Sequence, residues 1–512
     1  MDPDPGATEL DSSLGTPEDQ TRDEPDHQDQ DQDQDQDQEL LLWVPSGRRL
    51  ISGLLGINIV LLGAALVAGQ AFNPEGLKHQ EPQVFMLVLM GAGLIWMLWF
   101  LLWARKQPGI SPHKDHHAGG ITVILVLILF SAASLLLYVC RIGYLLSVRD
   151  LLFAALVFTC CLGFRSGLML ILSADLLLWL NSVMEDSVHE EIELEKQENF
   201  HFRNSTLCQC STSPVCVAFR KGFEILYPFH IEFYLMAGCM VYVMWKNVGR
   251  RTGPGHHVTQ KMTLRVIYEG GIIYGLVFGA LVLVAGATVF ILYQVWVSQH
   301  QFRLTAFLIF YGYHLAVMPV MSFCSLAGML VHRLERRAHE GGHNPTRSLD
   351  VMLLVAAALG QLGLSYFSLV AALALGTSTP LADLDLSYSL LSLLELILQN
   401  IFIIEGLHRH PKLLAKRKER SSVFQVAAFR FSFFSTSWTK RVIQEICAFL
   451  ILSNIMLWVI PAFGVHPQFE NGLGKQFFGF STWFVLVNLG QPLSVFYRMH
   501  SVGALMELLI SA

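Results

Sequence analysis

Apolar runs separated by short polar segments fill the chain from residue 50 to residue 498. Many of these runs approach the length of about 20 residues at which an α-helix crosses the hydrocarbon core of a bilayer. We predict spans at residues 50–69, 84–103, 120–140, 151–164, 167–183, 223–245, 271–296, 303–331, 349–375, 386–405, 443–463 and 476–498. A basic segment around residues 246–265 divides the spans into six and six. The pattern therefore predicts an all-α polytopic membrane protein with twelve transmembrane helices.

The fourth predicted span is the shortest. Its sequence, LLFAALVFTCCLGF at residues 151–164, has 14 residues. A helix needs about 17–25 residues to cross comfortably. This segment therefore either extends into residues 147–150 or re-enters the membrane from one side.

Composition supports the membrane class and sets one region apart. Hydrophobic residues make up 53% of the chain and charged residues only 15%, and the mean hydropathy is +0.46. A soluble domain could not bury that much apolar surface in one core. Asp, Glu and Gln dominate the first 40 residues. These residues include few apolar side chains, so burial cannot offset the entropy that ordering would cost. We predict a disordered acidic cytosolic tail at 1–45, an N-terminal six-helix half at 46–248 and a C-terminal six-helix half at 249–512.

The distribution of basic residues predicts the orientation. Lysine and arginine gather in the loops that follow even-numbered spans, with nine of them at residues 409–441. Because basic loops stay inside the cell, we expect both termini in the cytosol of a multi-pass plasma-membrane protein. Residues 412–420 could also contact anionic lipid headgroups. The sequon that begins at Asn204 lies in the longest outer loop, and a glycan there would test this topology.

The motifs of several catalytic classes are absent. The sequence holds no phosphate-binding lysine motif and no dinucleotide fingerprint. The segment His189-Glu190-Glu191 lacks the second histidine that a zinc-protease helix requires. We therefore expect no enzyme activity, no cofactor, no metal site, no nucleic-acid partner and no transport driven by ATP on this chain.

Polar residues inside the predicted spans are the functional candidates. An ionisable side chain at bilayer depth costs about 2.5–3.5 kcal/mol, so it needs a partner or a role. Asp175 lies in the fifth span, and His230 and Glu232 lie in the sixth. On an ideal helix His230 and Glu232 point about 200° apart, so we expect them to face two different surfaces.

The C-terminal spans carry a second set of polar residues. Glu395 and Gln399 are four residues apart in the tenth span, which places them on one helix face. Asn454 lies in the eleventh span, and the twelfth is predicted to end in FYRMHS, with Tyr497 and His500. Each of these groups could also serve as structural glue between helices. Together they are more typical of a path for protons than of a pocket for a large solute, because carboxylate and imidazole groups exchange protons readily.

Several of these stretches resemble the otopetrin family of proton-selective channels. The matching stretches occur in the family's order and include GLLGINIVLLGAALVAG, SADLLLWLNSVMEDSVHEEIE, FEILYPFHIEFYL, LQNIFIIEGLHR, LWVIPAFG and FYRMHS. The resemblance covers about residues 45–512. It implies a subunit of two six-helix, barrel-like halves that assembles as a homodimer. It also implies a channel that external acid opens and that carries protons inward without a cofactor.

The resemblance also assigns roles to residues of the C-terminal half and of the contact between halves. Gln399, Asn454 and Tyr497 resemble the glutamine, asparagine and tyrosine that constrict the C-terminal barrel. Glu232 and His500 resemble the carboxylate and histidine at the contact between the halves.

In the N-terminal half the resemblance is less complete. Asp175 resembles the acidic residue of the constriction there, and Tyr234, or its neighbour Phe233, resembles the tyrosine. The family usually has a longer fourth span that supplies a glutamine, and residues 150–166 contain no glutamine. This departure puts conduction through the N-terminal half in question.

Three hypotheses follow for the function. The first is a proton channel in which water and polar residues relay protons. The second is a proton-coupled secondary transporter, since twelve spans in two halves also describe such carriers. The third is a membrane regulator that does not conduct and acts through its acidic tail and outer loop. The expected partners are protons, membrane lipids and a second copy of the chain.

Overall fold

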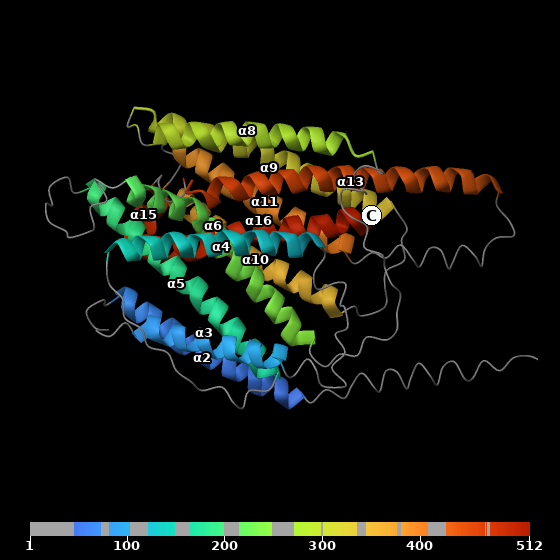
Figure 1. Cartoon of the computed structure of the whole chain (residues 1–512). Helices are drawn as coiled ribbons and strands as arrows, with labels where there is room; N and C mark the ends of the chain where they lie inside the picture. Colours follow the sequence, from blue (N-terminus) through green and yellow to red (C-terminus); the bar gives the residue numbers. More distant parts are fainter. Residues whose placement is uncertain are drawn as a thin grey trace, which may run out of the picture.

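A computed structural model describes residues 46–72, 81–102, 121–148, 164–198, 214–247, 271–297, 299, 301–334, 345–375, 380–407, 426–465, 467 and 472–511. All regular secondary structure in these ranges is helical, which confirms the predicted all-α class. The helices run roughly side by side, and α13 extends beyond the others at one end (Figure 1).

Five helices form a first group. They are α2 (Ser46–Phe72), α3 (Glu81–Leu102), α4 (Ile121–Val148), α5 (Phe164–Glu198) and α6 (Pro214–Asn247). Helix α5 is central, because it packs against α2, α3 and α6, and α4 packs against α6. Small residues allow the close contact of α2 with α5, since a Cβ at Gly63 would lie only 2.4 Å from the side chain of Leu177.

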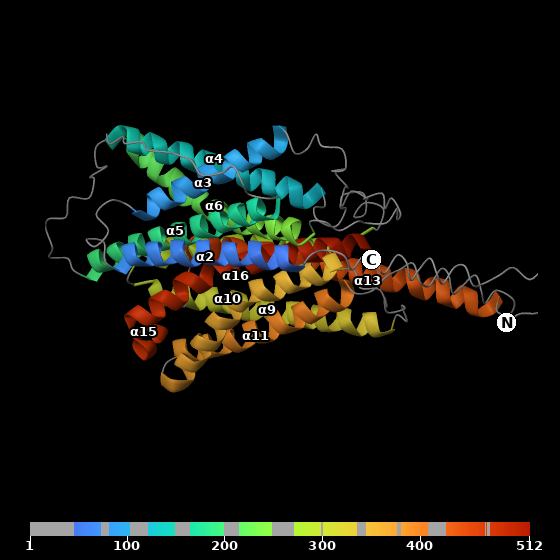
Figure 2. The same ribbon diagram turned by 90° about the horizontal axis from the view of Figure 1, so that it is seen from below.

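The remaining helices form a second group. They are α8 (Tyr274–Val297), α9 (Arg303–Leu334), α10 (Pro345–Leu375), α11 (Pro380–Leu407), α13 (Val426–Ala462), the short α15 (Leu473–Phe478) and α16 (Phe480–Ser511). Helix α13 packs against α8, α9 and α16, while α9 and α10 both pack against α11. Helix α16 also packs against α10. Figure 2 shows α16 lying between the first group and α10.

Most of the predicted spans coincide with helices. Within the described residues, ten helices are long and apolar enough to cross a membrane, and α4 carries a shorter apolar segment, Ile124–Cys140. Eleven of the twelve predicted spans overlap a helix. Except for its last residue, Phe164, the predicted fourth span at 151–164 lies outside the described residues, as do the tail at 1–45 and Asn204. The count of twelve and the arrangement in two barrel-like halves therefore stay predictions.

The predicted end of the last span was wrong. Helix α16 does not stop in FYRMHS but continues to Ser511, and its apolar segment runs over Thr482–Ile510. The reason is visible in the following sequence, VGALMELLI, in which Leu505, Leu508 and Leu509 are buried and extend the packed face of the helix. FYRMHS thus lies inside a helix and within the packed bundle.

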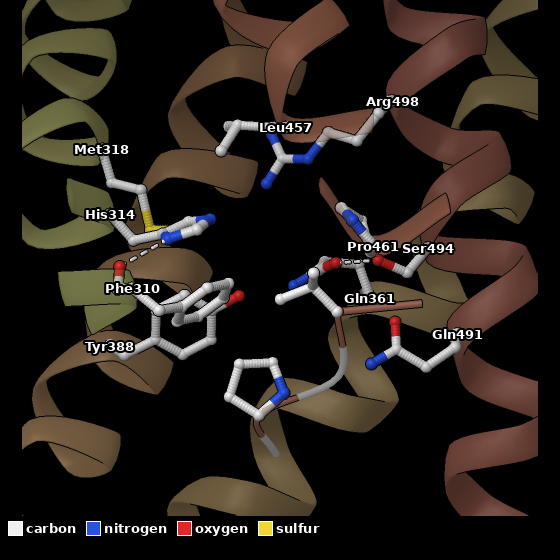
Figure 3. A pocket seen from close by; sticks show the side chains of 12 residues that line it. Phe310, His314, Met318, Gln361, Tyr388, Leu457, Pro461, Gln491, Ser494 and Arg498 are labelled. Carbon is white, nitrogen blue, oxygen red and sulfur yellow. Dashed lines mark hydrogen bonds between the residues drawn. The ribbon is translucent and has the colours of Figure 1, made fainter. Parts of the chain in front are cut away.

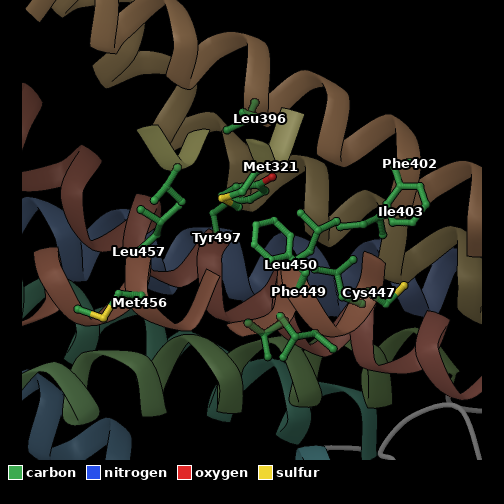
Figure 4. Packing of buried hydrophobic residues seen from close by; sticks show 14 of the residues in the cluster. Met321, Leu396, Phe402, Ile403, Cys447, Phe449, Leu450, Met456, Leu457 and Tyr497 are labelled. Atoms are coloured by element: carbon green, nitrogen blue, oxygen red, sulfur yellow. The ribbon is translucent and has the colours of Figure 1, made fainter. Parts of the chain in front are cut away.

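The core of the second group is a continuous apolar cluster. Figure 4 shows side chains of α9, α11, α13 and α16 interdigitating, with Met321, Phe402, Leu450 and Tyr497 among them. Lipid tails are as apolar as these side chains, so close packing and polar contacts hold such helices together. This cluster surrounds the polar residues described below.

The start of α8 is anchored on α13 by a carboxylate. Glu445 accepts hydrogen bonds from the backbone N–H groups of Ile273 (3.0 Å) and Gly275 (2.6 Å). A negative charge at a helix N-terminus is favourable, because the first N–H groups of the helix have no partner within it. Helices α8 and α13 approach so closely here that position 275 requires glycine, since a Cβ there would lie 2.0 Å from the Glu445 carbonyl oxygen.

Aromatic side chains join the two groups of helices. Phe130 of α4 stacks on Trp458 of α13, with ring centroids 6.2 Å apart. Phe229 of α6 contacts both Trp458 (5.8 Å) and Phe463 (5.9 Å). Helices α5 and α6 also pack against α16. Aromatic rings therefore contribute to the interface between the groups.

Candidate functional site

Five polar side chains from three helices meet inside the second group. They are Glu395 and Gln399 of α11, Asn454 of α13, and Tyr497 and Arg498 of α16. None of the five residues is more than 3% exposed. Because water does not cover these groups, they must satisfy one another.

An ion pair holds one side of this network. The Arg498 guanidinium lies 2.9 Å from one carboxylate oxygen of Glu395 and donates a hydrogen bond of 3.0 Å to the other. The Nη1 nitrogen of Arg498, which makes both of these contacts, also donates a hydrogen bond of 3.2 Å to the Asn454 side-chain oxygen. A buried charge requires such a counter-charge, so the pair is the electrostatic centre of the site.

Amide and hydroxyl groups continue the network from the ion pair. Asn454 donates to the Gln399 side-chain oxygen at 2.7 Å, and the Gln399 amide donates to Asn454 and to the Tyr497 hydroxyl, both at 3.3 Å. The Tyr497 hydroxyl donates in turn to the Asn400 side-chain oxygen at 3.3 Å. The structure thus brings Gln399, Asn454 and Tyr497 together, as the family resemblance implied, and adds Asn400.

Glu395 and Gln399 lie on one face of α11, as their spacing predicted, and side chains of other helices link them. Both side chains are buried on α11, one turn apart. Asn454 connects them, because its amide donates to Gln399 while its oxygen accepts from Arg498, the partner of Glu395. The i, i+4 spacing therefore aligns the two residues, and side chains of other helices link them.

A cavity reaches the network from the end of the bundle where α13 stops and α16 begins. It offers about 40 Å³ to the centres of water molecules, and a single water needs roughly 10–15 Å³ of such space. The lining residues come from α9, α10, α11, α13, α16 and the segment after α13: Phe310, His314, Met318, Gln361, Tyr388, Leu457, Pro461, Val465, Pro467, Gln491, Ser494 and Arg498. Figure 3 shows Arg498 pointing into this cavity. Arg498 thus belongs to both the cavity wall and the buried network.

A second polar cluster borders the same cavity. The Gln361 amide donates to the hydroxyl groups of Ser392 (2.8 Å) and Ser365 (3.2 Å), and Ser494 donates to the Gln361 side-chain oxygen. The Ser365 and Ser392 hydroxyls also lie 3.2 Å apart. Gln361 and Ser494 line the cavity, so this cluster offers waters there both donors and acceptors.

The polar residues of the first group are less connected. Asp175 of α5 is half-buried and makes no hydrogen bond or ion pair to any other described residue. Tyr234 of α6 is buried, and its hydroxyl shares a hydrogen bond with the Tyr138 hydroxyl of α4. The His230 ring lies edge-on to both tyrosines, with centroids 4.6 Å from Tyr234 and 5.1 Å from Tyr138. Among the described residues, no hydrogen bond joins Asp175 to Tyr234, so the structure does not link these two predicted partners.

His230 and Glu232 face different surfaces, which confirms the prediction from their helical spacing. The His230 ring contacts aromatic residues of α4 and α6. Glu232 instead accepts a hydrogen bond of 3.1 Å from the indole nitrogen of Trp458 on α13. Glu232 therefore lies at the contact between the two groups of helices.

His500 is half-buried on α16, with its ring centroid 5.7 Å from that of Phe496. No hydrogen bond or ion pair joins His500 to Glu232. The two residues that the resemblance assigned to one interface are therefore not linked by a hydrogen bond or ion pair.

Sequence reasoning missed three partners. Arg498 is the counter-charge of Glu395, and the signal was available, since a buried cation in FYRMHS requires an anion at the same depth. Trp458 and Tyr138 are the partners of Glu232 and Tyr234. Nothing in the sequence distinguished these two aromatic residues from the many others in the spans.

Sequence comparison shows which known proteins this chain is similar to. The sequence model of the Otopetrin family matches residues 194–499. The chain is 40% identical over 511 residues to "Proton channel OTOP3" of Homo sapiens, an alignment that covers 91% of this chain and 85% of that protein. It is 32% identical to "Proton channel OTOP2" of Homo sapiens, covering 91% of this chain and 95% of that protein. It is 30% identical to "Proton channel OTOP1" of Danio rerio, covering 90% of each.

Proposed function

Because this chain belongs to the otopetrin family, we propose that it is a proton-selective channel that extracellular acid activates and that conducts protons into the cell. The relatives reported above are named proton channels, and none of those names is that of an enzyme. The chain is a multi-pass membrane protein, and its many long apolar helices suit that activity.

The observation that carries the proposal is the buried polar network beside a cavity with room for water. A proton moves by exchange along hydrogen bonds, so it needs groups that can both donate and accept. The hydroxyl of Tyr497 and water in the cavity supply such groups, and the amides of Gln399 and Asn454 hold the hydroxyl in place by hydrogen bonds. A sodium or potassium ion would have to shed its water among closely packed apolar side chains, which cannot replace its hydration shell.

The arrangement supports a role for each of the candidate residues. Gln399, Asn454 and Tyr497 form the constriction of the C-terminal half, and Glu395 holds Arg498 at its edge. Asp175 and Tyr234 are the corresponding candidates in the N-terminal half, and His230 lies beside Tyr234.

Glu232 and His500 provide the response to pH at the contact between the groups. The position of Glu232 against Trp458 supports this role, because a proton gained or lost there changes a contact between helices.

The proposed architecture is a twelve-helix subunit of two six-helix, barrel-like halves, with both termini in the cytosol. The separate packing of the two groups of helices supports it, as does the concentration of Lys and Arg on one predicted side. Two copies associate in the plasma membrane through apolar helix faces that the single chain leaves exposed.

Whole-cell recording with acid outside and no permeant metal cation tests the proposal. We expect an inward current whose reversal potential shifts by about 59 mV for each unit of pH gradient, as for any singly charged species. Cells without the protein are the control. A surface-expressed chain with no such current would contradict the proposal, and saturable uptake of a solute would favour a proton-coupled transporter instead.

A further inference from the structure

His314 is a buried ionisable residue that the network described above does not include. It lies in the middle of α9, in the sequence YGYHLAV, and is 3% exposed. A polar ring at this depth carries a desolvation cost, so its hydrogen bonds decide its role. Its position in the wall of the cavity distinguishes it from a histidine packed in the core.

The hydrogen bond of His314 fixes its tautomer. The Nδ1 nitrogen lies 2.8 Å from the backbone carbonyl oxygen of Phe310. A carbonyl oxygen can only accept, so Nδ1 carries a hydrogen and donates it. The neutral ring therefore has its lone pair on Nε2, and Nε2 makes no hydrogen bond to any residue that the structure describes. Figure 3 shows this nitrogen directed toward the open centre of the cavity.

Titratable and charged groups surround His314 on three helices. They are Arg498 on α16, Tyr388, Asp385 and Glu395 on α11, and Tyr311 and Tyr313 on α9 itself. The Tyr388 ring is edge-on to His314 at 5.5 Å. Asp385 is engaged by the Tyr311 hydroxyl at 2.8 Å, and Tyr313 donates to the carbonyl of Val282 on α8 at 3.1 Å. Helices α10 and α13 contribute only uncharged side chains to the described cavity wall.

We propose that His314 accepts protons from the water of this cavity and passes them toward the buried network, a role that rests on the proposed channel function. An O–H bond of a hydronium ion breaks, an Nε2–H bond forms and a water molecule remains. The imidazolium then releases the Nε2 proton to a second water deeper in the cavity. That water becomes a hydronium ion, and the ring becomes neutral again. Nδ1–H remains bonded to Phe310 throughout, so the ring does not need to turn.

The ion pair of Arg498 and Glu395 sets the charge beside this cavity. Glu395 neutralises Arg498, which allows a positive charge on His314 in the same cavity. The pair stays charged throughout, so only His314 changes its protonation state.

The test compares His314→Asn with the wild-type chain by whole-cell recording at equal surface amounts, measured by surface biotinylation. The asparagine amide can still donate to the Phe310 carbonyl, but it cannot take up a proton at working pH. We expect the acid-evoked current to fall roughly a hundredfold, the lower range for a positioned proton acceptor. His332→Asn is the matched control, because His332 is buried on the same helix outside the cavity lining.

A second variant separates chemistry from packing. In His314→Ala the space left by the ring opens onto the cavity, so imidazole added outside should restore part of the current, while acetamide should not. An unchanged current and pH dependence in His314→Asn would overturn the role of His314, as would a loss of current in His314→Ala that imidazole does not relieve. A wild-type chain at the cell surface without a proton current would instead overturn the proposed function.

Discussion

Two glutamates, Glu395 and Glu232, are both buried at membrane depth but have different partners. Glu395, on α11, is paired with the guanidinium of Arg498 and connected to three further polar side chains. Glu232, on α6, has one hydrogen bond from the Trp458 indole, and its second oxygen has no hydrogen-bond partner among the described residues. The aromatic rings of Phe130, Phe229 and Trp458 meet near this contact.

The difference separates a charge that holds structure from a group free to exchange a proton. A buried carboxylate must be compensated by a cation, by several hydrogen bonds or by a proton. Arg498 compensates Glu395 permanently, so this pair fixes α11 against α16. No described cation compensates Glu232, so its state depends on the supply of protons. The paired site suits a static frame for conduction, and the unpaired one suits a sensor.

The largest effect is expected when the same substitution is made at both sites. Glu395→Gln leaves Arg498 buried without a counter-charge, and breaking such a pair costs about 3–5 kcal/mol. Glu232→Gln keeps the shape of the side chain and removes no salt bridge. We therefore expect much lower surface expression and a lower unfolding temperature in detergent for Glu395→Gln only.

The double variant Glu395→Gln/Arg498→Gln is the matched control, since it removes both charges and leaves two amides able to bond. It should recover much of the lost stability. Equal stability of Glu395→Gln and Glu232→Gln would contradict the comparison.

The next effect concerns which group of helices conducts. Asn454→Leu preserves approximate size but removes the link between Arg498 and Gln399, at a stability cost of about 1–3 kcal/mol for the groups left unpaired. We expect its acid-evoked current to be lost at matched surface amounts. Asp175→Asn should keep most of the current, because Asp175 joins no described network. The reverse result would place conduction in the first group of helices.

The smallest effect is a shift in pH response at Glu232. If uptake of a proton by Glu232 is part of activation, Glu232→Gln imitates the protonated state permanently. Its current should then activate at less acidic external pH, by a shift of about one unit or less, with a similar maximum. Currents recorded over a series of external pH values measure this shift. Trp458→Phe, which removes the only described hydrogen bond to Glu232, should change the same curve. An unchanged curve in both variants would remove Glu232 from the pH response.

Much of the helical pattern was predictable because a membrane span depends on local composition. Eleven predicted spans overlap helices. The meeting of Gln399, Asn454 and Tyr497 was expected from the family resemblance and not from local composition. The end of the last span was mistaken, because Arg498 looks like the boundary of an apolar run when its partner Glu395 is not known. A charge compensated by another helix no longer marks the limit of the membrane.

The amino-acid sequence by itself determined the all-helical class, the approximate position of most spans and the residue types available for proton exchange, because hydrophobic length and helical period act within one segment. Only the tertiary structure decided which polar groups meet. It paired Glu395 with Arg498 across 103 residues, left Glu232 with an indole, and opened a cavity in front of His314. The physical reason is that the energy of a buried charge depends on its neighbours in space, and those neighbours come from helices far apart in the chain.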